Sequence, residues 1–353
     1  MSRNKRITII IVLLVIISSC LILINNNKQK NESLDGDNVI ETYYDVRSGI
    51  SGFSLQFNDL PNEYQVSSEF SFEMMNQRLP IPSENKTVLN SIPNPNETEV
   101  FYLWEEGNVP ANTVINTYRE NSYDPIDFRP YITAINVPEG IEIKGAVVLL
   151  AGGAFQFRGD YTDTLMTAVQ LRENGYLPFI VDYRLRPYTQ EEGALDVARA
   201  VRFIRKNADI YGIDSNDIAV MGYSAGGILA GEFFISANND VVGSYLDSDY
   251  VTDSLDEIEA NASACGMIYA FYGRLSVANV DINQLKSYNL PPTFYAYGTQ
   301  DPFYNQFEEQ VEVMSDVGVS THTIVLDGWP HGFGGNGGWV DDYVIWLDEV
   351  FAK

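Results

Sequence analysis

The sequence has few cysteines, few histidines and few basic residues, and each scarcity restricts what the protein can be. Only two cysteines, Cys20 and Cys265, occur among its 353 residues. Cys20 lies in an apolar stretch near the N-terminus, so the rest of the chain contains Cys265 alone and cannot form an intrachain disulfide. We therefore expect a fold that is held together by its hydrophobic core, with Cys265 as a small buried residue.

Basic side chains are scarce relative to acidic ones. Lysine and arginine number 22 against 48 aspartates and glutamates, a net charge of −26 at neutral pH. The first 30 residues contain several basic side chains and no acid, so the remaining chain is more acidic still. Such a surface repels nucleic acid and anionic lipid head groups, and we expect neither as a partner. The charge is typical of a protein that is kept soluble outside the cell.

The sequence has only two histidines, His322 and His331, and no Cys/His cluster or phosphate-binding loop is present. The acidic segment 245–259 lacks the glycine and the spacing of a calcium loop, because Val251 stands at a ligand position. We predict no metal and no cofactor. Segment 245–259 is interpreted as solvated surface or part of a cap.

The first 30 residues have the features of a targeting segment. Basic residues at positions 3–6 precede Ile7–Ile24, a stretch of 18 residues without charge, which is close to the shortest membrane-spanning helix. Two fates stay open. The sequence "ISSC" resembles a lipoprotein cleavage site that would leave Cys20 lipidated, whereas the apolar continuation over 21–24 favours an uncleaved anchor. Either fate predicts a membrane-tethered protein whose main part is extracytoplasmic.

The chain divides by composition into four parts. After the targeting segment, 1–30, a polar, Asn-rich stretch predicts a flexible linker over 31–40. An aromatic region broken by Pro, Asn and Ser follows over 41–98, which we interpret as an N-terminal extension. Residues 99–353 form the main domain.

The main domain alternates apolar strands with amphipathic helices. Continuous apolar runs predict strands over 145–153, 178–185, 218–223, 265–273, 293–301 and 321–328. Helical patterns separate these runs, as over 194–212, where Val197, Val201 and Ile204 fall on one face. This alternation predicts an α/β fold with a mostly parallel sheet that helices cover on both faces.

A lone serine stands where one predicted strand gives way to a helix. The sequence Gly222-Tyr223-Ser224-Ala225-Gly226 places Ser224 between glycines at that junction. Glycines there let strand and helix converge around a sharp, strained turn, which exposes the serine hydroxyl. The pattern predicts Ser224 as a nucleophile.

A serine nucleophile needs a base and an acid. His331 lies in a loop rich in Gly and Pro, where catalytic groups are usually carried, whereas His322 lies inside a predicted strand. Asp301 ends the predicted strand 293–301, at the sheet edge where ligands collect, and completes the order Ser, Asp, His. Asp327 is a rival that precedes His331 by only four residues, and Asp341 and Asp342 follow the histidine. We predict the triad Ser224, Asp301 and His331.

Ester and amide chemistry at a serine also needs two backbone donors for the oxyanion. The N–H of Ala225 follows from the turn itself. The second donor should come from the loop after the strand 145–153, where Gly152, Gly153 and Ala154 are candidates. We expect Gly153 and Ala154 to form this part of the site.

These motifs together resemble a known family. The strand "DYRL", the helix "AVRFIRKNA", "YGID" and the turn "GYSAGG" are similar to those of α/β-hydrolase esterases of the acetyl esterase and acetylxylan esterase type. "FYLWEEGNVPA", "YGTQDPFY" and "PHGFG" extend the resemblance over about residues 100–353. It implies an α/β-hydrolase fold with Ser224 as nucleophile, Asp301 as acid and His331 as base.

The resemblance also implies an activity. We expect a serine esterase that removes short acyl groups, acetyl above all, from a small-molecule or carbohydrate ester such as acetylated xylan, without a cofactor. Two departures leave the substrate preference open: Ala154 stands where the family has a third glycine, and Ile228 where a histidine commonly follows the double glycine. A serine peptidase or lipase of the same fold, or a catalytically silent homologue that binds a glycan or a protein, are the alternatives.

Overall fold

The computed structural model describes residues 99–114, 124, 127–237 and 241–352. The predicted targeting segment, linker and extension, residues 1–98, lie outside these residues. Within the described ranges, no helix is long and apolar enough to cross a membrane.

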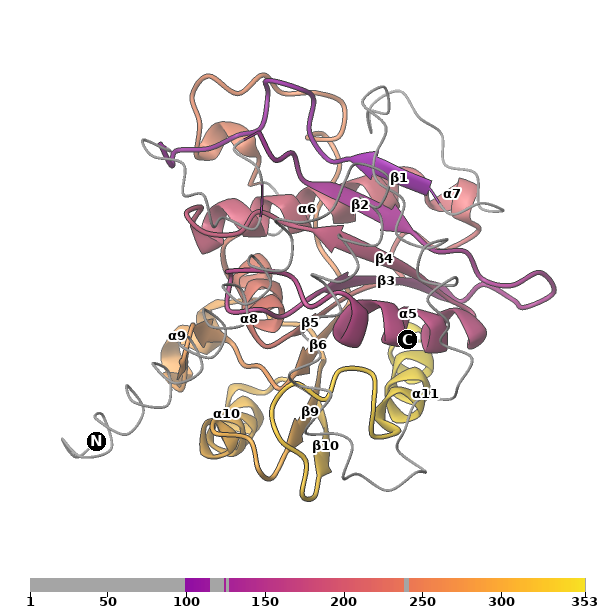
Figure 1. Cartoon of the computed structure of the whole chain (residues 1–353), viewed down its shortest axis with the longest axis vertical. Helices are drawn as coiled ribbons and strands as arrows, with labels where there is room; N and C mark the ends of the chain where they lie inside the picture. Colours follow the sequence, from indigo (N-terminus) through magenta and orange to yellow (C-terminus); the bar gives the residue numbers. More distant parts are fainter. Residues whose placement is uncertain (1–98, 115–123, 125–126, 238–240, 353) are drawn as a thin grey trace, which may run out of the picture. The chain divides into compact units, whose positions relative to one another are not determined.

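A sheet of eight strands forms the centre of the main domain, in the order β1-β2-β4-β3-β5-β6-β9-β10 (Figure 1). The strands are β1 (Glu99–Tyr102), β2 (Tyr131–Ala134), β3 (Gly145–Leu150), β4 (Tyr176–Asp182), β5 (Ile218–Tyr223), β6 (Ala264–Ile268), β9 (Thr293–Gly298) and β10 (Thr321–Leu326). From β4 to β10 all neighbours are parallel, which confirms the predicted sheet. The antiparallel pair β1 and β2 at one edge was not predicted, since each strand has only four residues.

Helices cover both faces of this sheet (Figure 1). On one face lie α5 (Met166–Glu173) and α11 (Trp339–Phe351), and on the other α6 (Gln190–Lys206), α8 (Ala225–Glu232) and α10 (Tyr304–Val317). Because of this double cover, every residue of β3 and β5 is buried. Cys265, on the neighbouring strand β6, is buried as well, as predicted. The shorter elements are η3 (Tyr161–Leu165), α7 (Ala208–Tyr211), η4 (Phe233–Ala237), η5 (Gly243–Tyr245), β7 (Gly273–Arg274), β8 (Val277–Ala278) and α9 (Ile282–Ser287).

Helix α6 begins four residues earlier than the predicted helix 194–212, because a polar cap extends it. The Thr189 hydroxyl accepts the Glu192 N–H at 3.2 Å, and the Glu192 carboxylate accepts the Thr189 N–H at 2.7 Å. This reciprocal capping box satisfies two backbone donors that the first turn would leave unpaired. Helix α6 also ends before the predicted boundary at 212: it stops at Lys206, and the separate turn α7 follows it.

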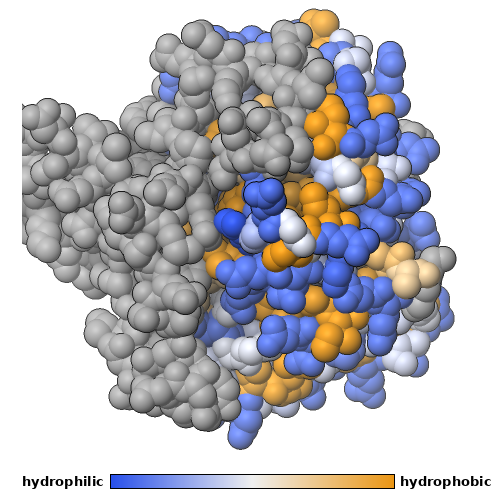
Figure 2. Space-filling view, turned by 90° about the vertical axis from the view of Figure 1, so that its right-hand side faces the viewer, coloured by the Kyte–Doolittle hydropathy of each residue, from blue (hydrophilic) through white to orange (hydrophobic). Residues whose placement is uncertain are grey.

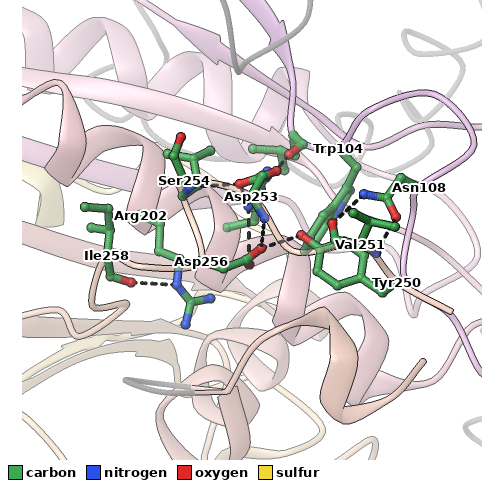
Figure 3. A network of polar contacts seen from close by, with 12 residues as sticks. Trp104, Asn108, Arg202, Tyr250, Val251, Asp253, Ser254, Asp256 and Ile258 are labelled. Atoms are coloured by element: carbon green, nitrogen blue, oxygen red, sulfur yellow. Dashed lines mark hydrogen bonds and ion pairs between the residues drawn. The ribbon is translucent and has the colours of Figure 1, made fainter. Parts of the chain in front are cut away.

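One of the two interpretations of the acidic segment 245–259 was solvated surface, but the segment is also tied to the domain by ion pairs. Arg199 of α6 is fully buried and forms ion pairs with Asp253 and Asp256 of this segment. Its Nε donates to the Leu103 carbonyl at 2.8 Å, and its guanidinium lies 4.8 Å from the centre of the Trp104 ring. Figure 3 shows Asp253 and Asp256 directed into this cluster beside Trp104 and Tyr250. The acids therefore fasten the segment to α6.

Replacing Arg199 by leucine should lower the free energy of unfolding by about 3 kcal/mol, because the change leaves two carboxylates without their buried cation. Urea denaturation measures this loss. Lys144→Met is the matched control: the Lys144–Asp348 pair is 39% and 44% exposed, so its loss should cost less than about 1 kcal/mol. Equal losses in the two variants would contradict a buried clamp at Arg199.

The outer surface of the domain is mixed rather than uniformly polar. On the face drawn in Figure 2, hydrophilic residues surround smaller groups of hydrophobic ones. The exposed large apolar side chains are spread over several elements: Val114, Ile141, Tyr245, Val251, Val277, Val280, Val325 and Ile345. Single apolar residues of this kind are normal for a globular surface.

Candidate active site

Ser224 occupies a strained turn between β5 and α8. Its backbone has φ 49° and ψ −117°, a conformation that a residue with a side chain rarely adopts. The flanking glycines make this turn possible: a Cβ on Gly222 would lie 2.1 Å from the Gly226 carbonyl oxygen, and one on Gly226 would lie 2.1 Å from that of Leu150. Strand, turn and helix are therefore packed too closely for any side chain at these two positions.

The structure brings together the three side chains of the predicted triad. His331 Nε2 lies 2.9 Å from Ser224 Oγ, and His331 Nδ1 lies 2.6 Å from Asp301 Oδ2. A carboxylate only accepts, so Nδ1 carries the proton and Nε2 is left to accept the serine hydroxyl. The other Asp301 oxygen accepts the Phe303 N–H at 2.8 Å, which fixes the carboxylate. Asp301 follows β9 by three residues rather than ending the strand, which stops at Gly298.

The surroundings of His331 tune its basicity. Burial opposes the charged imidazolium, but the negative charge of Asp301 and its hydrogen bond outweigh burial, so the pKa of His331 lies above its usual value. The rings of Tyr269 and Phe303 contact the imidazole edge-on, with centroids 4.8 Å and 5.8 Å away. An imidazole with a raised pKa holds a proton taken from serine more readily.

The loop after β3 passes directly beside the serine, as an oxyanion site requires. A Cβ added to Gly152 would lie 3.1 Å from Ser224 Cβ. The backbone then turns through positive φ at Gly153 (136°), Ala154 (54°) and Phe155 (58°). In the described part of the chain, the N–H groups of Gly153, Ala154 and Ala225 have no protein acceptor. These N–H groups remain available to a negatively charged oxygen.

Gly152, which was also considered, is already engaged: its N–H donates to Asp163 Oδ2 at 2.8 Å. The rival acids lie elsewhere. Asp327 is exposed and accepts the Thr299 hydroxyl at 3.1 Å. Asp341 and Asp342 are exposed in the first turn of α11, and His322 on β10 stacks on Phe294 with centroids 5.3 Å apart.

Two residues of the site were missed in the sequence, Asp163 of η3 and Tyr269 directly after β6. Both are buried, and the Tyr269 hydroxyl donates to Asp163 Oδ1 at 2.6 Å. Tyr269 follows the strand beside β5, at the sheet edge where Ser224 lies, and this position was the available signal. Nothing in the sequence distinguished Asp163 among 48 acidic residues.

Among the described residues, no group of three or more His, Cys, Asp or Glu side chains could hold a metal ion. The site presents a serine hydroxyl, an imidazole oriented by a carboxylate, and backbone donors beside them. This set is suited to acyl transfer.

Comparison with known proteins points to the same class. The BD-FAE family model matches residues 135–291. The chain is 23% identical over 199 residues to an acetylxylan esterase of Xylanibacter ruminicola, which covers 54% of this chain and 41% of that protein. An acetyl ester-xyloside bifunctional hydrolase from Caldicellulosiruptor lactoaceticus has a TM-score of 0.51 at 19% identity, over 74% of this chain and 95% of that one. Thermogutta terrifontis esterase 2, phosphoramylated by tabun, has a TM-score of 0.50 at 18% identity, over 74% and 96%.

The main domain therefore has the α/β-hydrolase fold. Within that class the chain resembles serine esterases of the acetylxylan esterase type, and the resemblance predicted from its motifs is confirmed. The chain spans less than half of the length of the curated relatives that it matches, 41% of the acetylxylan esterase and 20% of an endo-1,4-beta-xylanase B of Butyrivibrio fibrisolvens.

Proposed function

We propose that the protein is a serine carboxylic-ester hydrolase that removes short acyl groups, acetyl in particular. The observation that carries this proposal is the continuous contact from Asp301 through His331 to Ser224, at 2.6 Å and 2.9 Å, on a strained turn beside unpaired backbone donors. The esterases among its structural and sequence relatives support it.

In the acylation step, His331 Nε2 takes the proton of Ser224 Oγ as the oxygen attacks the ester carbonyl carbon. The carbonyl electron pair moves to oxygen, and the N–H groups of Ala225 and of Gly153 or Ala154 stabilise the resulting oxyanion. Asp301 stabilises the imidazolium. When the tetrahedral intermediate collapses, the C–O bond to the alcohol breaks, and the imidazolium returns its proton to the departing alkoxide.

In the deacylation step, His331 takes a proton from a water molecule, whose oxygen attacks the acyl-enzyme carbonyl. The same donors hold the second oxyanion. Collapse releases the carboxylic acid and returns the proton to Ser224, which restores the starting site. Each cycle therefore consumes one ester and one water and yields one acid and one alcohol.

The proposed substrate class is an acetylated carbohydrate. The acetylxylan esterase and the acetyl ester-xyloside hydrolase, to which the chain is similar, support this choice by their names. Tethering by residues 1–30 with an extracytoplasmic main domain is a further part of the proposal, supported by the basic start and the apolar stretch Ile7–Ile24. An extracytoplasmic main domain would have access to a polymeric substrate such as xylan.

Labelling by a fluorescent aryl phosphonate tests the reaction class. We expect the full chain to hydrolyse an aryl acetate, to lose that activity on labelling, and to carry the phosphonyl group on Ser224 in a peptide digest. Prior incubation with acetylated xylan should slow the labelling if the polymer occupies the site.

Turnover without labelling of Ser224 would contradict the proposed nucleophile. Labelling of Ser224 without acetate release would favour a longer acyl chain or an amide, as in a lipase or peptidase. A folded protein that neither turns over aryl acetate nor reacts with phosphonate would favour the silent binding homologue.

A further inference from the structure

Asp163 lies between two loops of the site without belonging to the triad. One is the loop after β3, 152–155, called here the oxyanion loop, and the other is the loop that carries His331, 328–338, called the histidine loop. Its carboxylate is buried on η3, a single π-helical turn of the kind that often marks functional sites. One oxygen, Oδ2, accepts the Gly152 N–H at 2.8 Å, and the other, Oδ1, accepts the Tyr269 hydroxyl at 2.6 Å. Both partners are donors, so the ionised form of the side chain is the one that fits them.

The bond to Gly152 holds the start of the oxyanion loop. The Gly152 carbonyl accepts the Gly159 N–H at 2.9 Å, so residues 159–163 hold both polar backbone groups of Gly152. The preceding carbonyl, of Ala151, accepts the Tyr183 hydroxyl at 2.6 Å. The next residues, Gly153 and Ala154, supply the proposed oxyanion donors. Because these residues follow Gly152 directly, the direction of their N–H groups depends on the fixed position of Gly152.

The bond to Tyr269 reaches the loop that carries the base. The Tyr269 hydroxyl, which donates to Asp163, accepts the Gly334 N–H at 3.2 Å. Its ring supports the imidazole of His331 and the ring of Phe333, with centroids 4.8 Å and 4.7 Å away. Tyr269 has a positive φ of 38°, so this placement is maintained against backbone strain.

The histidine loop also contacts η3 directly. The Gly335 N–H donates to the Thr162 carbonyl at 3.1 Å, and a Cβ on Gly334 would lie 2.0 Å from that same oxygen. The Gly334 carbonyl accepts the Trp339 indole N–H at 2.9 Å. The histidine loop is thus packed against the residue that precedes Asp163, with no room for movement toward it.

From this arrangement we propose that Asp163 and Tyr269 are positioning residues that hold the oxyanion donors and the base in one fixed geometry. Asp163 fixes Gly152 and hence the N–H groups that follow it, and Tyr269 passes the same constraint to His331 and Gly334. Neither side chain takes part in bond making. Their contribution is to keep the donors and the imidazole at the positions that the transition state requires.

The charge of Asp163 gives this role a signature in the pH dependence. Burial raises the pKa of Asp163 to about 6, although the hydrogen bonds from Tyr269 and Gly152 and the nearby His331 lower it, while Asp160 raises it. In return, the negative charge of Asp163 adds to that of Asp301 in raising the pKa of His331. At neutral pH the carboxylate is ionised and both of its bonds are made. Below about pH 6 it takes up a proton and one acceptor is lost.

The test compares Tyr269→Phe, Asp163→Asn and a control, Tyr272→Phe, in the full chain with an aryl acetate. Tyr272 is a buried tyrosine of the same segment whose hydroxyl lies 2.9 Å from Thr293 Oγ1, away from the triad. We expect Tyr269→Phe and Asp163→Asn to lower kcat by about 10- to 100-fold with KM changed less than about 2-fold. The control should stay within about 2-fold of the wild type in kcat.

Asp163→Asn should also move the acid limb of kcat/KM to lower pH, by on the order of half a pH unit, because it removes a negative charge near the imidazolium. The loss of kcat at nearly unchanged KM, in a variant that is folded, separates positioning from a role in stability alone. Thermal unfolding of each variant establishes that it is folded, and if one of the two variants fails to fold, the other decides.

Three results would overturn the inference. The first is a Tyr269→Phe variant with the same kcat as the control Tyr272→Phe, and the second is an effect of Tyr269→Phe and Asp163→Asn on KM alone. The third is loss of the fold in both of these variants, which would assign Asp163 and Tyr269 to stability. The inference rests on the proposed esterase function, and the two fail differently. If the wild type does not turn over the ester or react with phosphonate, the proposed function fails. If the wild type is active and the Tyr269 and Asp163 variants match it, only the positioning role fails.

Discussion

Replacing Ser224 by alanine should lower kcat for an aryl acetate on the order of 10⁶-fold, because it removes the attacking oxygen itself. The hydroxyl is the group to which Asp301 and His331 are aligned, through contacts of 2.6 Å and 2.9 Å, so neither can act in its absence. The residual rate should be that of the oxyanion donors and substrate binding alone, on the order of 10³-fold above water. Initial-rate kinetics with purified variant and wild type measure the loss.

Ser236→Ala is the matched control. Ser236 lies on η4, the turn after α8, and its hydroxyl donates to the Glu232 carbonyl at 3.0 Å. Its replacement removes one local hydrogen bond and should leave kcat within about 2-fold of the wild type. A Ser224→Ala protein that keeps a tenth of the wild-type rate would exclude Ser224 as the nucleophile.

Asp301→Asn should lower kcat/KM on the order of 10⁴-fold at neutral pH, since an amide in that position no longer holds the productive tautomer of His331. The pH profile carries a second signature. His331 must be neutral to accept the serine proton, and its pKa is raised by Asp301, so wild-type activity should fall as the pH drops through a value above the usual 6.5 of histidine. Without that charge, the pKa of His331 falls and the remaining activity should persist to lower pH.

Asp327→Asn provides the comparison for this change. Asp327 was the rival acid, but it is exposed and bonds Thr299 across the strand ends. Its variant should keep both the rate and the acid limb of the wild type. The reverse pattern, with the large loss in Asp327→Asn, would make Asp327 the acid and contradict the assignment of Asp301.

The sheet and the turn at Ser224 could be predicted because their signals are local. The runs that form β3, β4, β5, β6 and β9 are mostly apolar and buried along their whole length, as strands covered on both faces must be. The edge strand β10 was also predicted, although it is only partly buried. The edge strand β1 and its neighbour β2 escaped prediction because a run of only four residues has little pattern to show, even though most of these residues are buried. The start of α6 was misplaced because its polar first turn lacks the apolar periodicity, although Thr189 and Glu192 form a recognisable capping box.

The site divides in the same way. Ser224, His331 and Asp301 could be chosen from the sequence because the turn, the loop and the chain order each restrict the choice to one or two residues. The acidic segment 245–259 was harder to interpret, since the role of Asp253 and Asp256 depends on Arg199, which lies about fifty residues away in the chain and is buried beside Trp104. Ion pairs between distant segments leave no characteristic spacing in the sequence from which they could be predicted.

By itself, the sequence indicated the class of fold and predicted Ser224, Asp301 and His331 as nucleophile, acid and base, because strand periodicity and glycine sterics act locally and the chain has only two histidines. Only the tertiary structure shows that the Gly152 N–H is bonded to Asp163, and that Tyr269 joins this acid to the histidine loop. Asp163 and Tyr269 are 106 positions apart in the chain, and Tyr269 and Gly334 are 65 apart. These contacts exist because parallel strands deliver the ends of distant segments to one edge of the sheet, where hydrogen bonds select among them.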